Sequence, residues 1–368
     1  MISNIYSVLG KSGLRVSPFC LGAMTFGQAH QWNANQWGAD EASSREIFDY
    51  YVESGGNFID TAIGYTMGQS ETLVGKFIRE RGIRDKIVIG TKFGPNIDMT
   101  NPNTGGNGRK NIRFAVDTSL KRLGTDYIDL YWLHFWDTVT PPEEVVDSFD
   151  ALVRAGKILH YGLSNVPAWW MTRAHCYAQA SGKERPIALQ MEYSLVSRSI
   201  EREHRPACQD LGMGICTWSP LGSGFLSGKY RSIGVDEGKA ESVGRLDSTA
   251  GSPLFDRDKA RNWRILEALD EAADALGVPH AQVALSWLAG RPGVTSIILG
   301  ATKLEQFKQN LGAASLVLPD ELRAKLDEAS ALEVVSPYEF FRNPHRSMFR
   351  GKFAIDPWIS REAYSSDG

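Results

Sequence analysis

The chain has 368 residues, of which 42% are hydrophobic and 10% aromatic, so it can bury the core of one large domain or of two medium ones. A formal net charge of -3 at pH 7, with no run of Lys or Arg, argues against a protein that binds nucleic acid. The start MISNIYSVLG does not read as a signal peptide, and no segment approaches the ~18 apolar residues of a membrane span, which predicts a cytoplasmic protein with no membrane partner.

The first predicted element is a small hairpin, because YSVLGKSGLRVS alternates around Lys11-Ser12-Gly13. Eight short runs rich in Val, Ile, Leu and Tyr follow, and stretches of helical periodicity lie between them. In chain order these predicted strands are FCLGAM, NFID, KIVIGTKF, YIDLYWLH, ILHYGLS, IALQME, GICTW and SIILG.

Helices are predicted between the strands and after the last of them. Their ranges are 41–54, 70–81, 110–123, 143–155, 168–181, 261–276 and 321–332. Strands separated by helices form parallel pairs, in an open doubly wound sheet or in a closed barrel, and eight strands favour an α/β chain folded as a (β/α)8 TIM barrel. We expect residues 1–334 to form this barrel, with the hairpin at its bottom and long substrate-binding loops, and residues 335–368 to form a tail that could border the pocket.

Titratable residues lie at the ends of successive predicted strands. Asp60 ends the second barrel strand, Tyr65 follows on the next loop, Lys92 ends the third strand and His134 ends the fourth. Taken alone, each residue has a structural explanation. Asp60 could cap a turn, Tyr65 could pack as an aromatic, Lys92 could pair with Asp60, and His134 could hydrogen-bond the backbone. Together they predict an active site, because catalytic groups of a barrel gather at the carboxyl ends of its strands and a lysine within an apolar run needs a partner.

These residues also carry a family resemblance. The patterns Asp-x-x-x-x-Tyr, Thr-Lys and Leu-His-x-x-Asp, the last at Leu133, His134 and Asp137, resemble the aldo-keto reductase superfamily. The segments GLSN, LQMEYS, WSPLGSGFLSGKY and LGATKLEQFKQNLGA resemble its cofactor-binding segments, so the similarity covers roughly residues 5–330. The resemblance implies an NADPH-dependent reductase that transfers a hydride to an aldehyde or ketone, or runs the reverse alcohol oxidation.

The chemistry can also be argued from the residues. Reduction of a carbonyl needs an acid beside the developing alkoxide, and Tyr65 is the candidate. A phenol with a pKa of about 10 is a weak acid at neutral pH, but the ammonium of Lys92 would favour the phenolate and lower that pKa. Asp60 would hold Lys92, and His134 would donate to the carbonyl oxygen and orient the substrate.

The resemblance places the cofactor across the later strands. Ser164, Asn165 and Gln190 would bond the nicotinamide carboxamide, and Trp218 would stack on the ring. Lys303, in the segment that opens a helix after the eighth strand, favours NADP over NAD because the extra phosphate needs a cation. The run GSGFLSG lacks the spacing of a dinucleotide-binding Rossmann unit. The other cofactor-binding residues that the resemblance implies are Gly22, Met24, Thr25, Asp60, Ser219, Pro220, Leu221, Gly222, Gly224, Leu226, Lys229, Gly300, Thr302, Gln306 and Asn310.

The substrate pocket is predicted to have aromatic walls. Trp32, Trp37 and Trp136 are placed to line it, and aromatic walls suit bulky or flat groups, such as a steroid-like or terpenoid ketone or an aromatic aldehyde. Further candidates in the tail segment are Tyr338, Phe340, Phe341, Met348 and Phe349.

Three alternatives remain at this point. The chain could be a cofactor-binding regulatory subunit, similar to channel-associated members of the family. A metal-dependent hydrolase is disfavoured because the histidines are dispersed, and in a phosphate-binding aldolase or isomerase Lys92 would form a Schiff base. The scattered Cys20, Cys176, Cys208 and Cys216 predict buried free thiols and no metal site, and an oligomer is possible.

Overall fold

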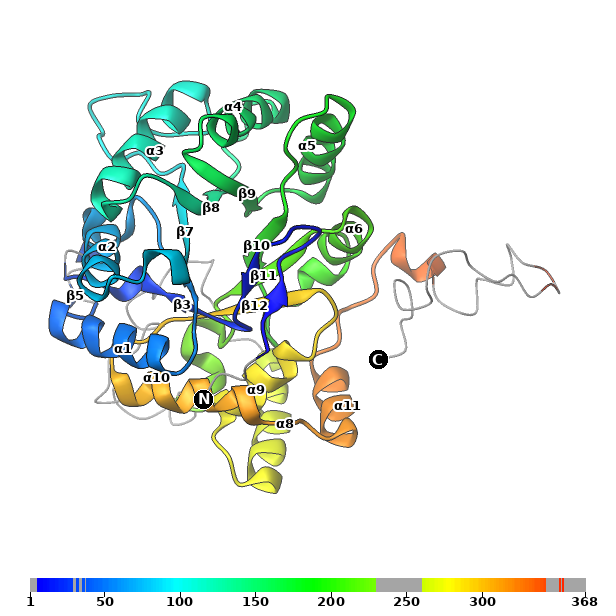
Figure 1. The fold of residues 1–368 in the computed structure, drawn as a ribbon. Coiled ribbons are helices and arrows are strands. Elements are labelled where there is room, and N and C mark those ends of the chain that lie inside the picture. The colour runs from blue at the N-terminus through cyan, green and yellow to red at the C-terminus, as the bar shows by residue number, and fades with distance from the viewer. Residues whose placement is uncertain are drawn as a thin grey trace.

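The computed structural model describes residues 5–28, 31–32, 35–36, 38–229, 260–341, 351 and 353 (Figure 1). Eight parallel strands close into a barrel in the order β10-β11-β12-β3-β6-β7-β8-β9. This arrangement confirms the predicted (β/α)8 barrel. The barrel strands are β3 Phe19–Gly22, β6 Phe58–Asp60, β7 Val88–Phe93, β8 Ile128–Leu133, β9 Ile158–Ser164, β10 Ala188–Glu192, β11 Gly214–Trp218 and β12 Val294–Leu299.

Helices surround the barrel, and several begin or end within one or two residues of their predicted limits. They are α1 Glu41–Glu53, α2 Gln69–Arg81, α3 Arg109–Leu123, α4 Pro142–Arg154, α5 Ala168–Ala180, α6 His204–Leu211, α8 Ala260–Leu276, α9 His280–Ala289, α10 Leu304–Leu311 and α11 Asp320–Ala329. None of these described helices combines the length and hydropathy of a membrane span.

The N-terminal hairpin is confirmed as β1 Ser7–Val8 paired antiparallel with β2 Arg15–Val16. A second small hairpin, β4 Gln31–Trp32 and β5 Asn35–Gln36, lies in the loop after β3 and was not predicted, because two-residue strands leave no alternation to detect. α6 and α9 were also missed. The predicted helix 321–332 ends earlier, at Ala329, where the chain turns at Ser330.

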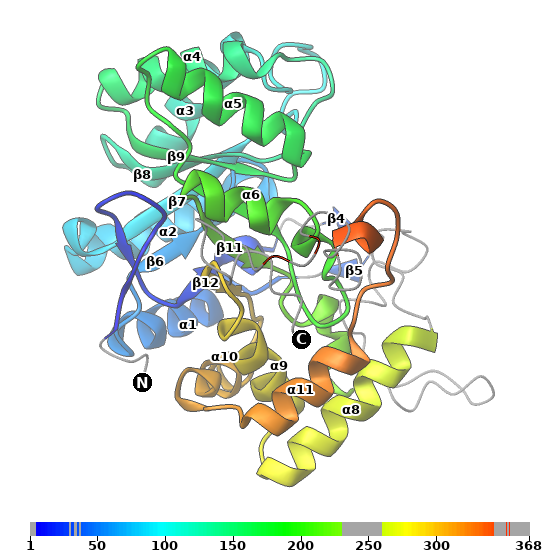
Figure 2. The same cartoon turned by 90° about the vertical axis from the view of Figure 1, so that its right-hand side faces the viewer.

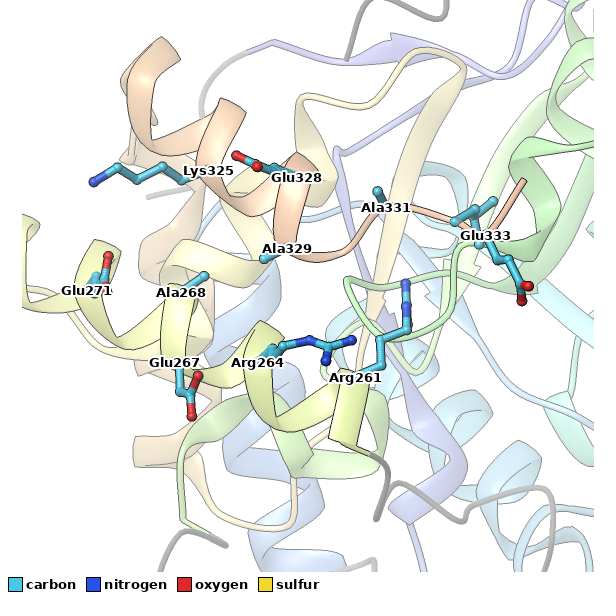
Figure 3. A pocket seen from close by; sticks show the side chains of 11 residues that line it. Arg261, Arg264, Glu267, Ala268, Glu271, Lys325, Glu328, Ala329, Ala331 and Glu333 are labelled. Atoms are coloured by element: carbon cyan, nitrogen blue, oxygen red, sulfur yellow. The ribbon is translucent and has the colours of Figure 1, made fainter. Parts of the chain in front are cut away.

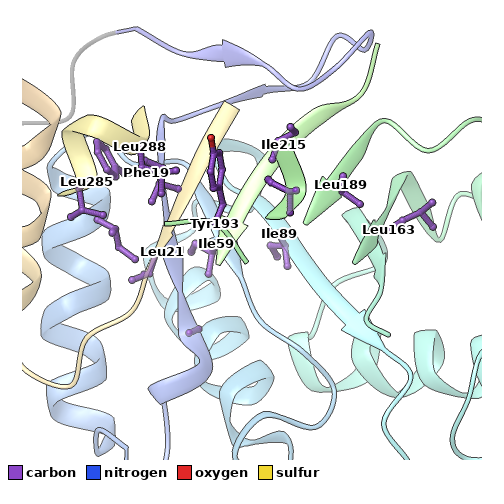
Figure 4. Close-up of a cluster of buried hydrophobic side chains, with 14 of the residues drawn as sticks. Phe19, Leu21, Ile59, Ile89, Leu163, Leu189, Tyr193, Ile215, Leu285 and Leu288 are labelled. Atoms are coloured by element: carbon purple, nitrogen blue, oxygen red, sulfur yellow. The ribbon is translucent and has the colours of Figure 1, made fainter. Parts of the chain in front are cut away.

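Side chains on each barrel strand alternate between the barrel interior and the helices, as the period of two requires. The interior cluster includes Phe58, Val88, Leu130, Ala188 and Cys216. The larger cluster lies between the strands and the helices, and Figure 4 shows its members Leu21, Ile59, Ile89, Leu163, Leu189 and Ile215 on β3, β6, β7, β9, β10 and β11. This register fixes which residue of each strand end faces the barrel axis.

The indole of Trp132 fills the middle of the barrel and leaves no room for neighbouring side chains. A Cβ atom on Gly162 would lie 2.3 Å from Trp132 Cζ3, and one on Gly90 would lie 3.0 Å from its Nε1. Glycine at these two strand positions therefore lets the interior close beneath the rim.

The burial of each cysteine depends on which face of its strand or helix carries it. Cys20, Cys208 and Cys216 are buried free thiols, as predicted. The prediction is wrong for Cys176, which is exposed because it lies on the face of α5 opposite the buried Met171, Ala174 and Ala178.

Candidate active site

The inward positions at the carboxyl ends of the strands carry polar side chains. On β6 the alternation that turns Phe58 inward also turns Asp60 inward, and on β7 it turns Val88 and Lys92 inward. Gln190 on β10 follows from Ala188 in the same way. Asp60, Lys92 and Gln190 are all buried above the apolar interior.

Lys92 is the centre of a hydrogen-bonded group. Its ammonium donates to the Asp60 carboxylate, to the carbonyl oxygen of Thr61 at 3.0 Å and to the hydroxyl oxygen of Tyr65 at 3.1 Å. The amide of Gln190 donates to the other carboxylate oxygen of Asp60 at 2.9 Å. All three donors of the ammonium therefore have acceptors, and one of these acceptors is the phenol of Tyr65.

Burial and charge oppose each other at this ion pair. Burial lowers the pKa of Lys92, but the Asp60 carboxylate and Tyr65 raise it further, so the pKa lies above its ordinary value. Burial raises the pKa of Asp60, and Lys92 and Gln190 oppose that shift only in part. The raised pKa of Lys92 favours a charged ion pair, whereas the raised pKa of Asp60 favours a neutral carboxyl. The ion pair agrees better with the geometry, since every hydrogen bond to Asp60 comes from a donor that prefers a carboxylate.

His134 lies directly after β8 and faces Tyr65. The two rings meet edge to face with centroids 5.8 Å apart, and the imidazole stacks on Phe135 at 4.0 Å. Burial, followed by the charge of Lys92, holds the pKa of His134 well below its usual value, so the ring is neutral at pH 7. Its buried Nδ1 has no hydrogen-bond partner among the described residues. A neutral imidazole carries one N–H donor, so a ring beside the Tyr65 phenol can donate a hydrogen bond to a carbonyl oxygen through whichever nitrogen faces it.

Asn165 and Trp218 form a second group at the ends of β9 and β11. The Asn165 amide donates to the His134 carbonyl oxygen and to the Ser164 hydroxyl, each at 2.9 Å, and accepts from Trp218 Nε1 at 3.2 Å. These bonds fix the plane of a partly exposed indole next to amide and hydroxyl groups. A flat aromatic surface beside amides fits the ring and the carboxamide of a nicotinamide.

Two of the predicted carboxamide ligands are engaged within the protein. Ser164 accepts from Asn165, Gln190 donates to Asp60, and both side chains are almost fully buried. Of the three predicted ligands, Asn165 is the one that is partly exposed.

Backbone strain concentrates at the same rim. The described residues other than glycine with positive φ all lie in loops that follow β6, β8, β9 or β11. They are Thr66, Met67, Thr138, Asn165, Ser219 and Ser223. Each such conformation costs about 1–3 kcal/mol and tends to persist at functional sites. The concentration of strain therefore points to the carboxyl rim independently of the side chains.

The remaining predicted cofactor residues lie on three segments. η1, Ala23–Thr25, includes Met24 and follows Gly22 at the end of β3, and its Thr25 hydroxyl donates to the Ala301 carbonyl oxygen at 2.8 Å. This bond holds η1 beside the segment from Gly300 to Lys303 that precedes α10. On α10, Gln306 is exposed and Asn310 is buried.

The third segment is the loop after β11. It runs from Ser219 and Pro220 through Leu221 into η5, Gly222–Ser227, and both Gly222 and Gly224 have positive φ. The side chain of Leu226 is buried, so only its backbone could meet a ligand, whereas Lys229 is exposed. Within the loop, the N–H of Ser223 donates to the Ser219 hydroxyl at 3.0 Å and the Ser227 hydroxyl donates to the Gly224 carbonyl oxygen at 2.7 Å.

Aromatic residues also lie in the loop after β8 and at the start of α5. Trp136 packs edge to face on Trp169, with ring centroids 5.7 Å apart. Phe135 and Trp169 are 47% and 57% exposed. Neither was predicted to line the pocket, although Phe135 lies between His134 and Trp136 and Trp169 lies in the predicted helix 168–181. Only the backbone of Trp32 is described, and Trp37 lies outside the described residues.

The tail candidates are only partly described. Tyr338 lies in η7, Tyr338–Phe341, and donates from its hydroxyl to Glu203, while Phe340 and Phe341 are exposed. Met348 and Phe349 lie outside the described residues.

Two surface grooves lie away from these groups. Figure 2 shows α8 and α11 side by side, and Figure 3 shows the groove of about 690 Å³ between them, lined by charged side chains such as Arg264, Glu267 and Lys325. The other groove, of about 540 Å³, is lined by residues of α3 and α4 with Lys157 and Lys183. Neither is lined by a residue of the Lys92 group, and within the described part of the chain no three potential ligands gather into a metal site.

Comparisons with known proteins identify the family of the chain. The model of the aldo/keto reductase family matches residues 18–331. A norsolorinic acid reductase of Aspergillus flavus is 35% identical over 94% of this chain and 86% of its own length. An aldo-keto reductase, ausK, of Aspergillus calidoustus is 34% identical over 91% of this chain and 84% of its own length. An aryl-alcohol dehydrogenase of Pestalotiopsis microspora is 32% identical over 89% of this chain and 83% of its own length. The chain therefore belongs to the aldo/keto reductase family and is an oxidoreductase that acts on small-molecule carbonyl compounds and their alcohols.

Proposed function

We propose that the protein is an NADPH-dependent reductase of aldehydes or ketones, with Tyr65 as its general acid. The observation that supports this most directly is the ammonium of Lys92, which bonds Asp60 on one side and lies 3.1 Å from the Tyr65 hydroxyl on the other. A buried cation in contact with a phenol stabilises the phenolate that remains when the phenol gives up its proton.

In this proposal each residue of the group has one task. The Tyr65 hydroxyl donates its proton to the carbonyl oxygen as negative charge develops there, and Lys92 stabilises the resulting phenolate. Asp60 compensates the charge of Lys92 and fixes its position. The neutral His134 bonds the carbonyl oxygen and so orients the substrate.

A bound nicotinamide would supply the hydride. Trp218 would hold the ring, and Asn165 would hold its carboxamide, in a plane already fixed by their mutual hydrogen bond. The loop from Ser219 to Lys229 would line the pyrophosphate, and Lys303 with Gln306 would meet the adenosine end.

The substrate is proposed to be a bulky or aromatic carbonyl compound. The rings of Tyr65, His134 and Phe135 contact one another in turn, and Trp136 follows next in the chain and packs on Trp169. Among the relatives, one is named for norsolorinic acid and another for aryl alcohols, which agrees with an aromatic substrate. We further propose that residues 335–368 border this pocket and that the protein acts in the cytoplasm.

The test is a turnover assay with the full chain. NADPH oxidation is followed with a panel of aromatic aldehydes, bulky cyclic ketones, dicarbonyls and small aliphatic aldehydes. We expect the highest kcat/KM with the aromatic and cyclic compounds, because they bury the most surface on the aromatic wall. Tight NADPH binding without turnover of any compound would contradict the proposal and would favour a cofactor-binding regulatory protein.

Cofactor preference should depend on Lys303. Substitution Lys303→Met is expected to raise the Kd for NADPH about 10-fold to 100-fold and to leave the Kd for NADH unchanged, because a charge-assisted contact with the extra phosphate is worth about 1.5–3 kcal/mol. Fluorescence titration of both cofactors measures this. Lys325→Met, which removes an exposed lysine on α11, is the matched control. Equal losses for NADPH and NADH in Lys303→Met would show that this residue does not read the phosphate.

A further inference from the structure

The loop that carries Tyr65 is also held from its outer side, by a second ion pair. Glu71 lies in the first turn of α2 with its side chain completely buried. Arg122 on α3 donates from Nη1 to Glu71 Oε2 at 3.2 Å and to the carbonyl oxygen of Ile63 at 2.7 Å. Ile63 directly precedes Gly64 and Tyr65. One guanidinium nitrogen therefore bonds both a buried carboxylate and the backbone of the Tyr65 loop.

The same carboxylate reaches the strand that carries Lys92. The hydroxyl of Thr91 on β7 donates to Glu71 Oε1 at 2.7 Å. Thr91 faces the helices, whereas Lys92 faces the barrel axis, because neighbouring residues of a strand point to opposite sides. The backbone N–H of Ile63 also donates to the Lys92 carbonyl oxygen at 2.9 Å. Glu71 and Arg122 thus tie together the two chain segments whose side chains meet at the Tyr65 hydroxyl.

The backbone after Tyr65 is strained, and Arg122 packs against it. Thr66, Met67 and Gly68 have φ values of 46°, 54° and 90°. A Cβ atom on Gly68 would lie only 2.4 Å from Arg122 Cζ, so the guanidinium lies directly on this glycine. A strained turn persists where its surroundings leave it no relaxed alternative. Arg122 supplies such contacts on both sides of Tyr65, at Ile63 and at Gly68.

We propose that Arg122 and Glu71 are positioning residues that keep the Tyr65 hydroxyl within hydrogen-bond reach of Lys92. The proposal rests on the proposed role of Tyr65 as general acid. Neither residue contacts the reacting groups, and both act through the backbone between Ile63 and Gly68. Without Arg122 the strained turn relaxes, the phenol moves away from the ammonium, and proton donation to the substrate slows.

The described titratable groups that face Tyr65 are Lys92 on β7 and His134 after β8, with Asp60 behind Lys92. Of these, Lys92 is the cation that stabilises the phenolate. A larger separation between Lys92 and Tyr65 therefore moves the alkaline limb of the kcat profile to higher pH, since the phenol then loses its proton less readily. A substitution that only loosened the fold would not move this limb.

The test compares Arg122→Met with Lys121→Met, which removes an exposed positive charge from the adjacent position of α3. The full chain is assayed with NADPH and 4-nitrobenzaldehyde for kcat, KM and the pH profile, and the Kd for NADPH is titrated separately. In Arg122→Met we expect kcat to fall about 10-fold to 100-fold, because a small misplacement of a catalytic group costs rate on this scale. The alkaline limb should move to higher pH, the Kd should stay within about twofold, and Lys121→Met should match wild type.

Glu71→Gln keeps the size of the side chain but removes its charge, and it is expected to move the alkaline limb in the same direction as Arg122→Met. An unchanged limb and kcat in folded Arg122→Met, or in Glu71→Gln where Arg122→Met does not fold, would overturn the proposal. A wild type that turns over no carbonyl compound would instead show that the proposed function is wrong. Loss of activity in Tyr65→Phe combined with a normal Arg122→Met would show that only the positioning role is wrong.

Discussion

Substitution Tyr65→Phe is expected to lower kcat for carbonyl reduction by about 10²-fold to 10⁴-fold, the range that a positioned general acid contributes. The change removes one oxygen atom, which accepts a hydrogen bond from Lys92 at 3.1 Å. The ring can keep its edge-to-face contact with His134, so the shape of the pocket is preserved. Initial rates with saturating NADPH and a reactive aromatic aldehyde measure the effect.

The control is Tyr127→Phe, which removes a phenol at the opposite end of the barrel, just before β8. It should leave kcat unchanged. The Kd for NADPH should stay within about twofold in both variants, because neither hydroxyl is placed on the cofactor. A Tyr65→Phe enzyme with more than about a tenth of the wild-type kcat would exclude Tyr65 as the principal acid, since the lower end of the expected range is a 10²-fold loss.

The barrel could be predicted because each strand is a short apolar run with turn residues at its ends, and counting eight such runs selects a closed sheet. The placement of Asp60, Lys92 and His134 at one rim follows from the same argument, since parallel strands end at the same edge. Strand periodicity even fixes that Asp60 and Lys92 point inward.

The outer support of the Tyr65 loop could not be predicted in this way. Glu71 and Arg122 lie on two helices and read as ordinary charged positions of amphipathic surfaces. Their contact depends on how α2 packs against α3, which no single-sequence pattern specifies. The strained turn at Thr66 and Met67 is equally hidden, because neither residue type favours positive φ.

The hydrogen bonds of Ser164 and Gln190 within the protein could not be predicted from the sequence either. A residue-by-residue comparison with the family assigns both side chains to the cofactor. In the structure one supports Asn165 and the other supports Asp60. These bonds hold Asn165 and Asp60 in place, and each side chain keeps a further hydrogen-bonding group, so its contact with a carboxamide stays a prediction of the family resemblance.

Substitution Lys92→Met is expected to abolish most of the activity and to destabilise the fold. The kcat should fall by at least about 10²-fold, because the phenolate of Tyr65 loses its cation. The free energy of unfolding should fall by about 3–5 kcal/mol, the usual cost of removing one partner from a buried ion pair. Urea denaturation and the carbonyl reductase assay measure the two losses separately.

The loss of stability should depend on pH, through Asp60. Burial already raises the pKa of Asp60, and without Lys92 the carboxyl has lost the group that opposes this shift. A carboxyl whose pKa is higher in the folded than in the unfolded state favours folding below the unfolded pKa of about 3.9, and that contribution is lost as the pH rises through the folded pKa. Lys92→Met should therefore be most destabilised, relative to wild type, at neutral and alkaline pH and least destabilised in acid.

The double variant Asp60→Asn/Lys92→Met separates stability from chemistry. It removes both charges, so it should recover much of the free energy of unfolding and lose the pH dependence, while kcat stays as low as in Lys92→Met. Recovery of activity together with stability would mean that Lys92 serves the fold and not the proton transfer. Stability recovered without activity would assign the ammonium to Tyr65 as its electrostatic partner, a role for which the 3.1 Å contact is already in place.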